Sequence, residues 1–323
     1  MIQLILAGLT WKECLAYLDD VIVLGNSFQN HLENLKKVLQ RFKENNLKLK
    51  PKKCSFFQTE VLFLGKLVNE YGVSINPESK ETITKWPTLK CKRDVQSFLG
   101  FANYHREHIK DYAKLAAPLY EVTKKKGSFR WEKEQQDAFK IIQQALLKSA
   151  TLAYPYPDEP FILDTDASND TIGAELVQVY DGKEYVVCYA SKVITPAQRR
   201  YCTTRKELLA VVTFTKQFRN YLLGRQFVER TDHNSLTWLL RFKTIEGQLA
   251  RLLEALSEYD MVVQHRAGKK HGNVDGLSRR PDDIPRCDCY YAGSSLESLP
   301  CGGCVYCTRA QRNWERFETD VVT

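Results

Sequence analysis

The sequence predicts an α/β protein whose C-terminal half forms a mixed five-stranded sheet with flanking helices. Between residues 154 and 280 the expected elements follow the order strand, strand, strand, helix, strand, helix, helix, strand, helix. The first three strands are antiparallel, because Asp181 and Gly182 form a favourable hairpin turn between the second and the third. The later alternation of helix and strand requires parallel additions to the same sheet.

Length and composition indicate a soluble protein of more than one domain. About 150 residues per domain is typical, so 323 residues predict two or three domains. The chain is 27% charged and 43% hydrophobic, which is ordinary for a globular protein. It contains neither the roughly 18 consecutive apolar residues of a membrane helix nor the pattern of a signal peptide. We therefore expect a cytoplasmic or nuclear protein with no membrane partner.

The positive charge is concentrated in short stretches. The net charge is +8, and residues 36 to 53 hold eight basic residues and one acid, Glu44. Two further basic runs lie at residues 124 to 126 and 269 to 270. These stretches favour nucleic acid as the partner, because neutralised phosphates release counterions, although a solvated basic face is the alternative. The candidate contacts to nucleic acid are Lys48, Lys50, Lys52 and Lys53.

Residues 14 to 25 read CLAYLDDVIVLG and predict a buried hairpin with its turn at Asp19 and Asp20. Two aspartates make a poor hairpin turn, because neither accepts positive φ as glycine does. A pair of divalent cations would explain the two adjacent acids. A solvated hairpin tip is the alternative.

The segment between this hairpin and the C-terminal sheet predicts helices and apolar hairpins. A first helix carries Leu32, Leu35, Leu39 and Phe42 on one face, with Asn30 as its N-cap. The stretches 46 to 57 and 61 to 77 predict apolar hairpins. A second helix begins at Asn76 and Pro77 and ends at Trp86 and Pro87.

Two more helices are predicted before the sheet. One spans roughly residues 92 to 112 and places Val95, Phe98, Leu99 and Ala102 at helical spacing on one face. The other spans roughly residues 132 to 148 and leads into the C-terminal sheet.

Four acidic residues stand where the predicted sheet would bring them together. Asp166 lies in the first strand, Glu207 near the start of a helix, and Asp232 and Asp275 after later strands. The last three have structural alternatives, namely a capping box of Glu207 with Thr204 and the stabilisation of helix N-termini by Asp232 and Asp275. Asp166 has none, because we expect a carboxylate in mid-strand among apolar residues to be desolvated.

These motifs together resemble a known family. Tyr17-Leu18-Asp19-Asp20 resembles the catalytic hairpin of reverse transcriptases, and SFLGFANYHR, at residues 97 to 106, resembles their thumb. TDAS, RKELLAV, TDH and NVDGLSR resemble the motifs of ribonuclease H. Up to about Pro281 the chain is similar to the polymerases of gypsy-type LTR retrotransposons. The resemblance implies the C-terminal part of a palm at 1–75, thumb and connection helices at 76–150, a ribonuclease H domain at 151–281 and a Cys-rich linker at 282–323.

The resemblance implies hydrolysis of RNA in RNA/DNA hybrids with two Mg²⁺ or Mn²⁺ ions, which neutralise the attacking and leaving oxygens. Carboxylates suit such hard cations. By resemblance Asp166 bridges both metals, Glu207 and Asp232 complete one site, and Asp275 helps to hold the other. His265, in a loop ten residues before Asp275, would shuttle protons, with His271 as a competitor.

The resemblance also implies roles in binding and limits on polymerisation. Tyr104 and Arg106 would flank a duplex backbone, unless Tyr104 belongs to the core and Arg106 is a solvated charge. A reverse transcriptase needs a third palm aspartate, which belongs far upstream of its catalytic hairpin, and no aspartate precedes Asp19. We therefore expect no polymerisation by this chain alone and treat Asp19 and Asp20 as a polymerase remnant.

Two other functions stay open at this point. The chain could be a non-catalytic nucleic-acid-binding protein left from a decayed element. It could also be a homodimer, or a subunit that supplies thumb and ribonuclease H to a complete reverse transcriptase.

The ten cysteines fall into two groups. Five are scattered along the chain and are expected to be reduced and buried, namely Cys14, Cys54, Cys91, Cys188 and Cys202. Five lie close together near the C-terminus and are candidate zinc ligands, namely Cys287, Cys289, Cys301, Cys304 and Cys307. A flexible reduced linker is the alternative for the second group.

Overall fold

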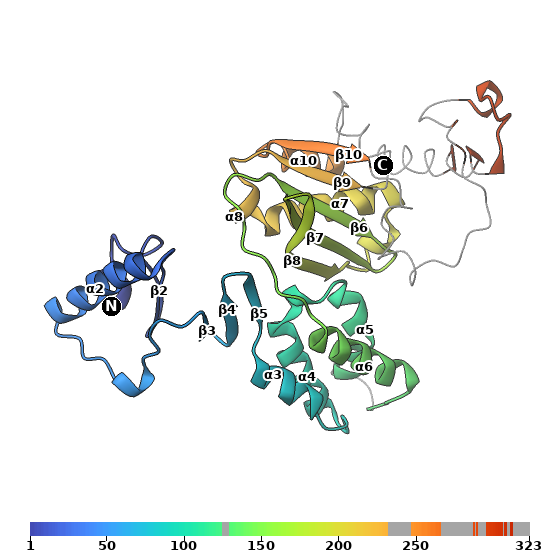
Figure 1. Ribbon diagram of the computed structural model, residues 1–323. Coiled ribbons are helices and arrows are strands. Elements are labelled where there is room, and N and C mark those ends of the chain that lie inside the picture. The colour runs from blue at the N-terminus through green and yellow to red at the C-terminus, as the bar shows by residue number, and fades with distance from the viewer. Residues whose placement is uncertain are drawn as a thin grey trace. The chain divides into compact units, whose positions relative to one another are not determined.

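The computed structural model divides into two compact units, each described by itself below (Figure 1). The first unit comprises Met1–Trp86 and Ser149–Tyr154, and the second comprises Pro87–Lys148 and Pro155–Thr323. The structure describes residues 1–124, 129–231, 247–265, 287, 289, 295–305, 307–308 and 311–312.

The N-terminal part of the first unit packs two helices around a short hairpin. The helices are α1 (Ile2–Ile5) and α2 (Phe28–Glu44), and the hairpin joins β1 (Cys14–Tyr17) to β2 (Asp20–Val23). Its core holds Leu6, Cys14, Val38 and Phe42, which are nearly inaccessible to solvent. The hairpin itself is largely half-buried or exposed, so the expectation of a buried hairpin is wrong.

The turn of this hairpin lies one residue earlier than predicted. Tyr17 pairs with Asp20, so the two turn residues are Leu18 and Asp19, and Asp20 is the first residue of β2. Leu18 adopts a φ of 51°, the left-handed conformation that a two-residue hairpin turn demands. The register of the β1–β2 hairpin therefore follows the two-residue turn at Leu18 and Asp19, and the turn is not centred on the two aspartates.

The N-cap of helix α2 lies three residues earlier than predicted. Ser27 is the N-cap, and its hydroxyl accepts a hydrogen bond from the backbone N–H of Asn30. Asn30 is therefore a residue of the first turn and not the cap. The buried stripe consists of Asn34, Val38 and Phe42, whereas Leu39 is 37% exposed.

The rest of the first unit is a small antiparallel sheet and a helix. The sheet joins β3 (Glu60–Phe63), β4 (Lys66–Asn69) and β5 (Gly72–Ile75), and the 3₁₀ turn η1 (Pro51–Lys53) precedes it. Helix α3 (Pro77–Thr84) begins as predicted, because the side chain of Asn76 accepts from the backbone N–H of Glu78.

The segment 149–154 belongs to the first unit because it bonds to β5. The backbone N–H of Val73 donates to the carbonyl of Leu152 at 2.9 Å, and the reverse bond has the same length. Gly72 permits this approach, since a Cβ at that position would lie 1.9 Å from the Leu152 carbonyl oxygen.

Three α-helices open the second unit. Helix α4 (Lys92–Tyr104) buries Val95, Phe98, Leu99 and Ala102 as predicted, but it ends at Tyr104 and not near residue 112. The turn η2 (Arg106–His108) follows it, and the chain then forms a separate helix, α5 (Tyr112–Thr123), which was not predicted. Helix α6 (Lys133–Leu147) begins with a capping box of Glu132 and Gln135.

The sheet of the second unit confirms the predicted fold class. Its strands are β6 (Phe161–Ala167), β7 (Thr171–Tyr180), β8 (Lys183–Val193), β9 (Phe227–Thr231) and β10 (Met261–His265), in the spatial order β10-β9-β6-β7-β8. The first three are antiparallel, and β9 and β10 add in parallel. Asp181 and Gly182 form the turn between β7 and β8 with positive φ at both residues, as predicted.

Helix α7 (Thr203–Gln217) packs against β6 and β7 (Figure 1). Phe161 and Leu163 from β6 and Phe214 from α7 belong to the same buried cluster. The short η3 (Gln198–Arg200) precedes α7, and α8 (Arg219–Leu222) and α10 (Gly247–Glu254) follow it. A second cluster joins Leu208, Val211 and Val212 of α7 to Leu256, which follows α10, so α7 is buried on two sides.

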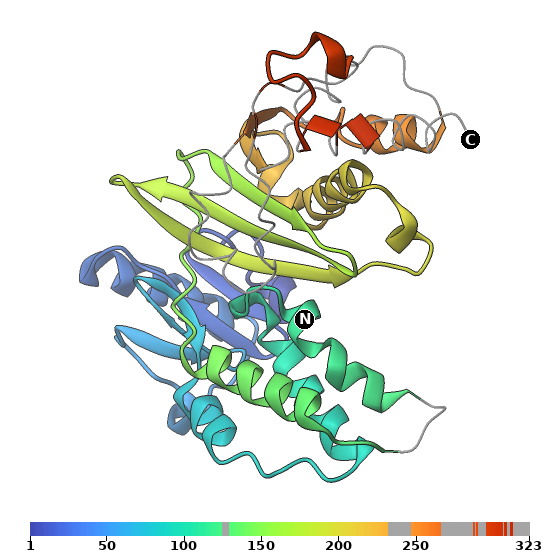
Figure 2. The same ribbon diagram turned by 90° about the vertical axis from the view of Figure 1, so that its right-hand side faces the viewer.

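Helix α5 lies against β8 (Figure 2). Two polar contacts join the start of this helix, and Lys110 just before it, to the sheet. The ammonium of Lys110 lies 2.6 Å from a carboxylate oxygen of Glu175, and the hydroxyl of Ser191 accepts from the backbone N–H of Ala113 at 2.8 Å. These contacts place the helices of residues 87–148 in the same compact unit as the sheet.

Among the helices that the structure describes, none is both long and apolar enough to cross a membrane. All ten cysteines are free thiols. Cys14 and Cys202 are buried as expected, but Cys91 is exposed and Cys54 and Cys188 are only partly covered.

Candidate active site

Asp166 lies one residue before the C-terminal end of β6, and its carboxylate is exposed. Its neighbours Thr165 and Ala167 are buried, because successive side chains of a strand point to opposite faces. The expectation that Asp166 would be desolvated in mid-strand is therefore wrong. An exposed residue at a strand end is accessible to solvent.

The parallel strands β6, β9 and β10 end at one edge of the sheet. Asp164 pairs with Arg230, and His265, the last residue of β10, pairs with Thr231, the last residue of β9. The predicted ligand Asp232 follows Thr231 in sequence but lies outside the described residues, as do Asp275 and His271.

His265 does not occupy a loop as predicted. Its backbone completes the ladder of β10 beside β9. A residue held by a strand ladder has less conformational freedom than a loop residue. The position of His265 in a strand therefore fits a mobile proton shuttle less well than a position in a loop would.

Glu207 lies in the second turn of α7, and its side chain is almost wholly buried, with 2% of the residue exposed. The N-cap of α7 is Cys202, and its side chain makes no capping hydrogen bond, so the alternative role of Glu207 in a capping box with Thr204 is wrong. A carboxylate buried this deeply needs hydrogen-bond donors or a cation nearby.

A third carboxylate, that of Asp111, approaches β7 from the helical region. Gly173, the β7 partner of Asp166, has no side chain, and a Cβ at that position would lie 2.7 Å from an oxygen of Asp111. Paired residues of a sheet have Cβ positions about 5 Å apart, so Asp111 lies close to the strand end that carries Asp166. No local sequence pattern indicates this approach, because Asp111, the N-cap of α5, and Gly173, in β7, lie far apart in the sequence.

A partly buried ion-pair network crosses the same sheet. The guanidinium of Arg230 in β9 bonds to both carboxylate oxygens of Asp164 in β6, and to Glu184 in β8 at 2.6 Å. Burial alone would lower the pKa of Arg230, but the bonds to Asp164 and Glu184 raise it above its usual value. Arg230 is thus permanently charged and ties three strands together.

Glu229 is a buried carboxyl group that the sequence reasoning missed. It is 1% exposed, and it accepts a 2.6 Å hydrogen bond from the hydroxyl of Thr165. Burial raises the pKa of Glu229 well above its ordinary value. The period-2 pattern of β9 could have indicated that Glu229 is buried. Glu229 lies on the same face of the strand as Phe227 and Thr231, which are buried.

The predicted polymerase and nucleic-acid-binding residues are exposed. Asp19 and Asp20 are exposed at the tip of the first hairpin. Tyr104 is 51% exposed, which excludes the alternative that it belongs to the core, and Arg106 is also exposed. The four lysines are exposed in η1 and the loop before it, namely Lys48, Lys50, Lys52 and Lys53.

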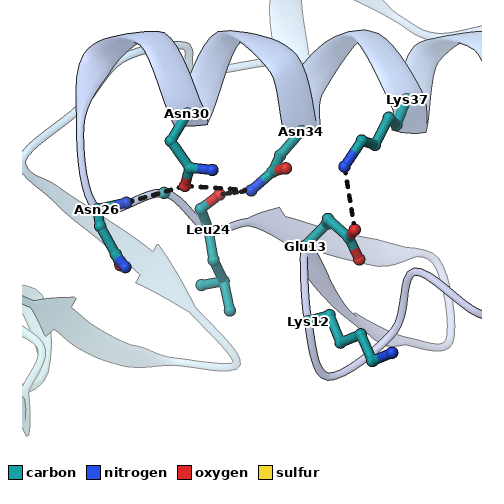
Figure 3. Close-up of a pocket in the computed structure, with 8 residues that line it drawn as sticks. Lys12, Glu13, Leu24, Asn26, Asn30, Asn34 and Lys37 are labelled. Atoms are coloured by element: carbon teal, nitrogen blue, oxygen red, sulfur yellow. Dashed lines mark hydrogen bonds and ion pairs between the residues drawn. The ribbon is translucent and has the colours of Figure 1, made fainter.

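A hollow of about 350 Å³ beside α2 contains none of these residues (Figure 3). Its polar groups bond to one another, since Lys37 pairs with Glu13 at 3.1 Å and the amide of Asn34 donates to the Leu24 carbonyl at 2.9 Å. We assign it no binding function.

Four of the five C-terminal cysteines converge. The sulfur atoms of Cys287, Cys301, Cys304 and Cys307 all lie within 4.8 Å of one another, and Cys289 is not part of this group. The backbone N–H of Cys304 donates to the Cys301 sulfur and is the main reason that the pKa of Cys301 falls to about 6. Burial raises the pKa of Cys307.

Two protein families match parts of the chain. Residues 1–68 match reverse transcriptase (RNA-dependent DNA polymerase). Residues 131–228 match an RNase H-like domain found in reverse transcriptase. The second match includes Asp166, Glu207 and the whole of β6, β7 and β8.

Transposon polyproteins resemble the chain over most of its length. It is 36% identical over 276 residues to the retrovirus-related Pol polyprotein from transposon 297 of Drosophila melanogaster, covering 85% of this chain and 26% of that polyprotein. It is 31% identical over 283 residues to that from transposon gypsy of the same organism, covering 83% and 27%. The transposon Tf2-3 polyprotein of Schizosaccharomyces pombe is 31% identical over 287 residues, covering 87% and 22%. The chain thus spans about a quarter of the length of these relatives.

Solved structures share the fold. The foamy viral protease-reverse transcriptase in complex with RNA/DNA hybrid has a TM-score of 0.72 at 20% identity, covering 91% of this chain and 40% of that chain. The foamy viral protease-reverse transcriptase dRH in complex with ds DNA has the same TM-score and identity, covering 82% and 47%.

Proposed function

We propose that this chain, whose homologues are the retrovirus-related Pol polyproteins of LTR transposons, is a metal-dependent ribonuclease that cuts RNA in RNA/DNA hybrids. The observation that carries the proposal is the exposed carboxylate of Asp166 at the sheet edge where β6, β9 and β10 end. Glu207, on the helix that packs against β6, would supply a second carboxylate.

The donor atoms fit divalent magnesium or manganese. Both cations prefer oxygen ligands, and Asp166 and Glu207 offer carboxylate oxygens, with Asp232 and Asp275 proposed as the remaining ligands. The burial of Glu207 fits the same role, because a cation nearby would offset the cost of removing its charge from water. Two bound cations would neutralise charge on the attacking and leaving oxygens of a phosphodiester.

The residues around these carboxylates would organise the site. The ion pairs of Arg230 with Asp164 and Glu184 fix the relative positions of β9, β6 and β8. The proposed proton carrier is a histidine, His265 or His271, whose ordinary pKa near 6.5 suits proton transfer at neutral pH.

Nucleic acid is the proposed partner of both compact units. The foamy viral structures of the same fold were solved with ds DNA and with RNA/DNA hybrid. On this chain the exposed Tyr104 and Arg106 would contact the duplex backbone, together with the basic loop of Lys48, Lys50, Lys52 and Lys53. We retain the proposed roles of palm for 1–75, thumb and connection for 76–150, ribonuclease H for 151–281 and linker for 282–323.

For this chain by itself we propose no polymerase activity. Its reverse transcriptase match contains the exposed Asp19 and Asp20, whereas a reverse transcriptase needs a third palm aspartate besides this pair. Primer extension on poly(rA)/oligo(dT) should therefore give no product. Template-dependent incorporation that disappears in Asp19→Asn would contradict this proposal.

The alternative function is nucleic-acid binding without catalysis, and cleavage of a labelled RNA/DNA hybrid by the purified chain distinguishes the two. Cleavage should require Mg²⁺ or Mn²⁺ and leave 5′-phosphate and 3′-hydroxyl ends. Asp166→Asn should reduce it more than about 100-fold, since even the outer-shell partners of a metal are worth about 10-fold to 100-fold.

Asp170→Asn is the matched control. Asp170 is an exposed aspartate four residues from Asp166, and it pairs with Arg199 at 3.1 Å. This variant should cleave at the wild-type rate. Hybrid binding without cleavage by the wild-type chain would favour the non-catalytic alternative, and equal activity of both variants would refute the role of Asp166.

A further inference from the structure

Three of the four converging cysteines, Cys301, Cys304 and Cys307, lie close together in sequence around a tight turn. Gly302 and Gly303, between Cys301 and Cys304, have φ of 63° and 79°, a left-handed pair that reverses the chain tightly. The backbone N–H of Gly302 donates to the Leu299 carbonyl at 2.9 Å. Thr308 donates from its backbone N–H and from its hydroxyl to the Cys304 carbonyl, at 2.9 Å and 3.1 Å. This turn brings three cysteines onto one side of the chain.

The sulfur positions fit one tetrahedral ion better than a disulfide. The sulfur atoms of Cys301 and Cys307 lie 3.4 Å apart, well beyond the roughly 2.05 Å of an S–S bond. Thiolates held about 2.3 Å from one zinc ion at tetrahedral angles lie about 3.8 Å apart. The observed separation and the 4.8 Å limit for the whole group bracket that value.

We propose that Cys287, Cys301, Cys304 and Cys307 bind one zinc ion in a closed structural site. Zinc accepts four thiolates in tetrahedral geometry without redox chemistry, and four protein ligands leave no open position for a substrate. This site differs from the proposed nuclease site in ligand chemistry, because sulfur selects zinc and carboxylate oxygen selects magnesium.

Zinc binding would join Cys287 to the turn at Cys301–Cys307. Each ligand must be deprotonated to bind, so zinc uptake releases protons and involves no oxidation of sulfur. Because the metal holds segments that are distant in sequence, its binding free energy contributes to the folding of this region. The site should therefore stabilise the C-terminal region without taking part in hybrid cleavage.

The test uses the full chain, reduced and freed of metal, then loaded with ZnCl₂ or CoCl₂. We expect one zinc ion per chain by elemental analysis after desalting. Cobalt should give the visible bands of a tetrahedral ion and a near-ultraviolet thiolate-to-cobalt band. Cys304→Ser should abolish both signals, and the control Cys289→Ser, which changes a neighbouring cysteine outside the cluster, should keep them.

Thiol protection in the wild-type chain removes the ambiguity of a variant that misfolds. Zinc should protect Cys287, Cys301, Cys304 and Cys307 from N-ethylmaleimide, as read by peptide mass, while the exposed Cys91 stays reactive. A chelator should reverse the protection. Absence of bound zinc, bound iron in place of zinc, equal loss of metal in both serine variants, or a Cys301–Cys307 disulfide that prevents zinc uptake would each overturn the proposal.

Discussion

The buried carboxyl group of Glu229 should make the stability of the sheet depend on pH in a way that one substitution removes. Glu229 is 1% exposed, and burial raises its pKa well above the ordinary value. Glu229→Gln keeps the shape and keeps a carbonyl oxygen that can accept the 2.6 Å hydrogen bond from Thr165. It removes the titrating proton.

The sign and the magnitude follow from proton linkage. Above the unfolded pKa of about 4.3, the unfolded chain loses the proton of Glu229 while the folded chain retains it. The unfolded state then binds fewer protons, so this group lowers the free energy of unfolding by about 1.4 kcal/mol per pH unit until the folded pKa is reached. Its stabilising contribution is complete below the unfolded pKa and is lost as the pH rises.

The assay is urea unfolding of the full chain, followed by circular dichroism between pH 4 and pH 8. The stability of Glu229→Gln relative to wild type should rise across this range, with a slope near 1.4 kcal/mol per pH unit once the pH is well above the unfolded pKa of about 4.3. Glu254→Gln, which makes the same substitution at an exposed carboxylate at the end of α10, is the control. A constant difference for Glu229→Gln would refute the burial of an uncharged carboxyl group.

Two further predictions concern the ion-pair network and the basic loop. Arg230→Met should destabilise the chain by about 3 kcal/mol or more in urea unfolding, because it leaves Asp164, 14% exposed, without its partner. Arg199→Met breaks only an exposed pair with Asp170 and should lower the free energy of unfolding by less than about 1 kcal/mol. Equal destabilisation by the two substitutions would contradict a stabilising role for the Arg230 ion pairs. Replacing Lys48, Lys50, Lys52 and Lys53 by Gln should weaken hybrid binding in fluorescence anisotropy. Each lost phosphate contact should lower the log-log salt slope by about 0.9, and an unchanged slope would show that this loop does not contact the duplex.

Much of the fold followed from local sequence patterns. The alternation of strands, the Asp181-Gly182 turn and the Asn76-Pro77 helix start are short-range signals, and the structure confirms each of them. Helix α5 was missed because Pro118 lies within it, and Asp111 in the left-handed conformation separates it from η2. Its position depends on contacts with β7 and β8, which no local pattern encodes.

The errors elsewhere arose where a local pattern allowed more than one outcome. Ser27 and Asn30 can both cap a helix, and Ser27 is the cap in the structure. The exposure of Asp166 could not be predicted from its apolar neighbours, because side-chain direction near a strand end depends on what covers each face. The cysteine spacing predicted candidate zinc ligands, but only the folded turn separates Cys289 from the other four.

A double-mutant cycle on hybrid cleavage tests most directly whether Asp166 and Glu207 act in one metal site. Asp166→Asn and Glu207→Gln should each slow single-turnover cleavage more than about 100-fold, with hybrid binding retained. The double variant should be no slower than the slower single variant, because residues that hold the same cations act as a unit. Multiplication of the two effects, or full activity of either single variant, would contradict a shared catalytic site.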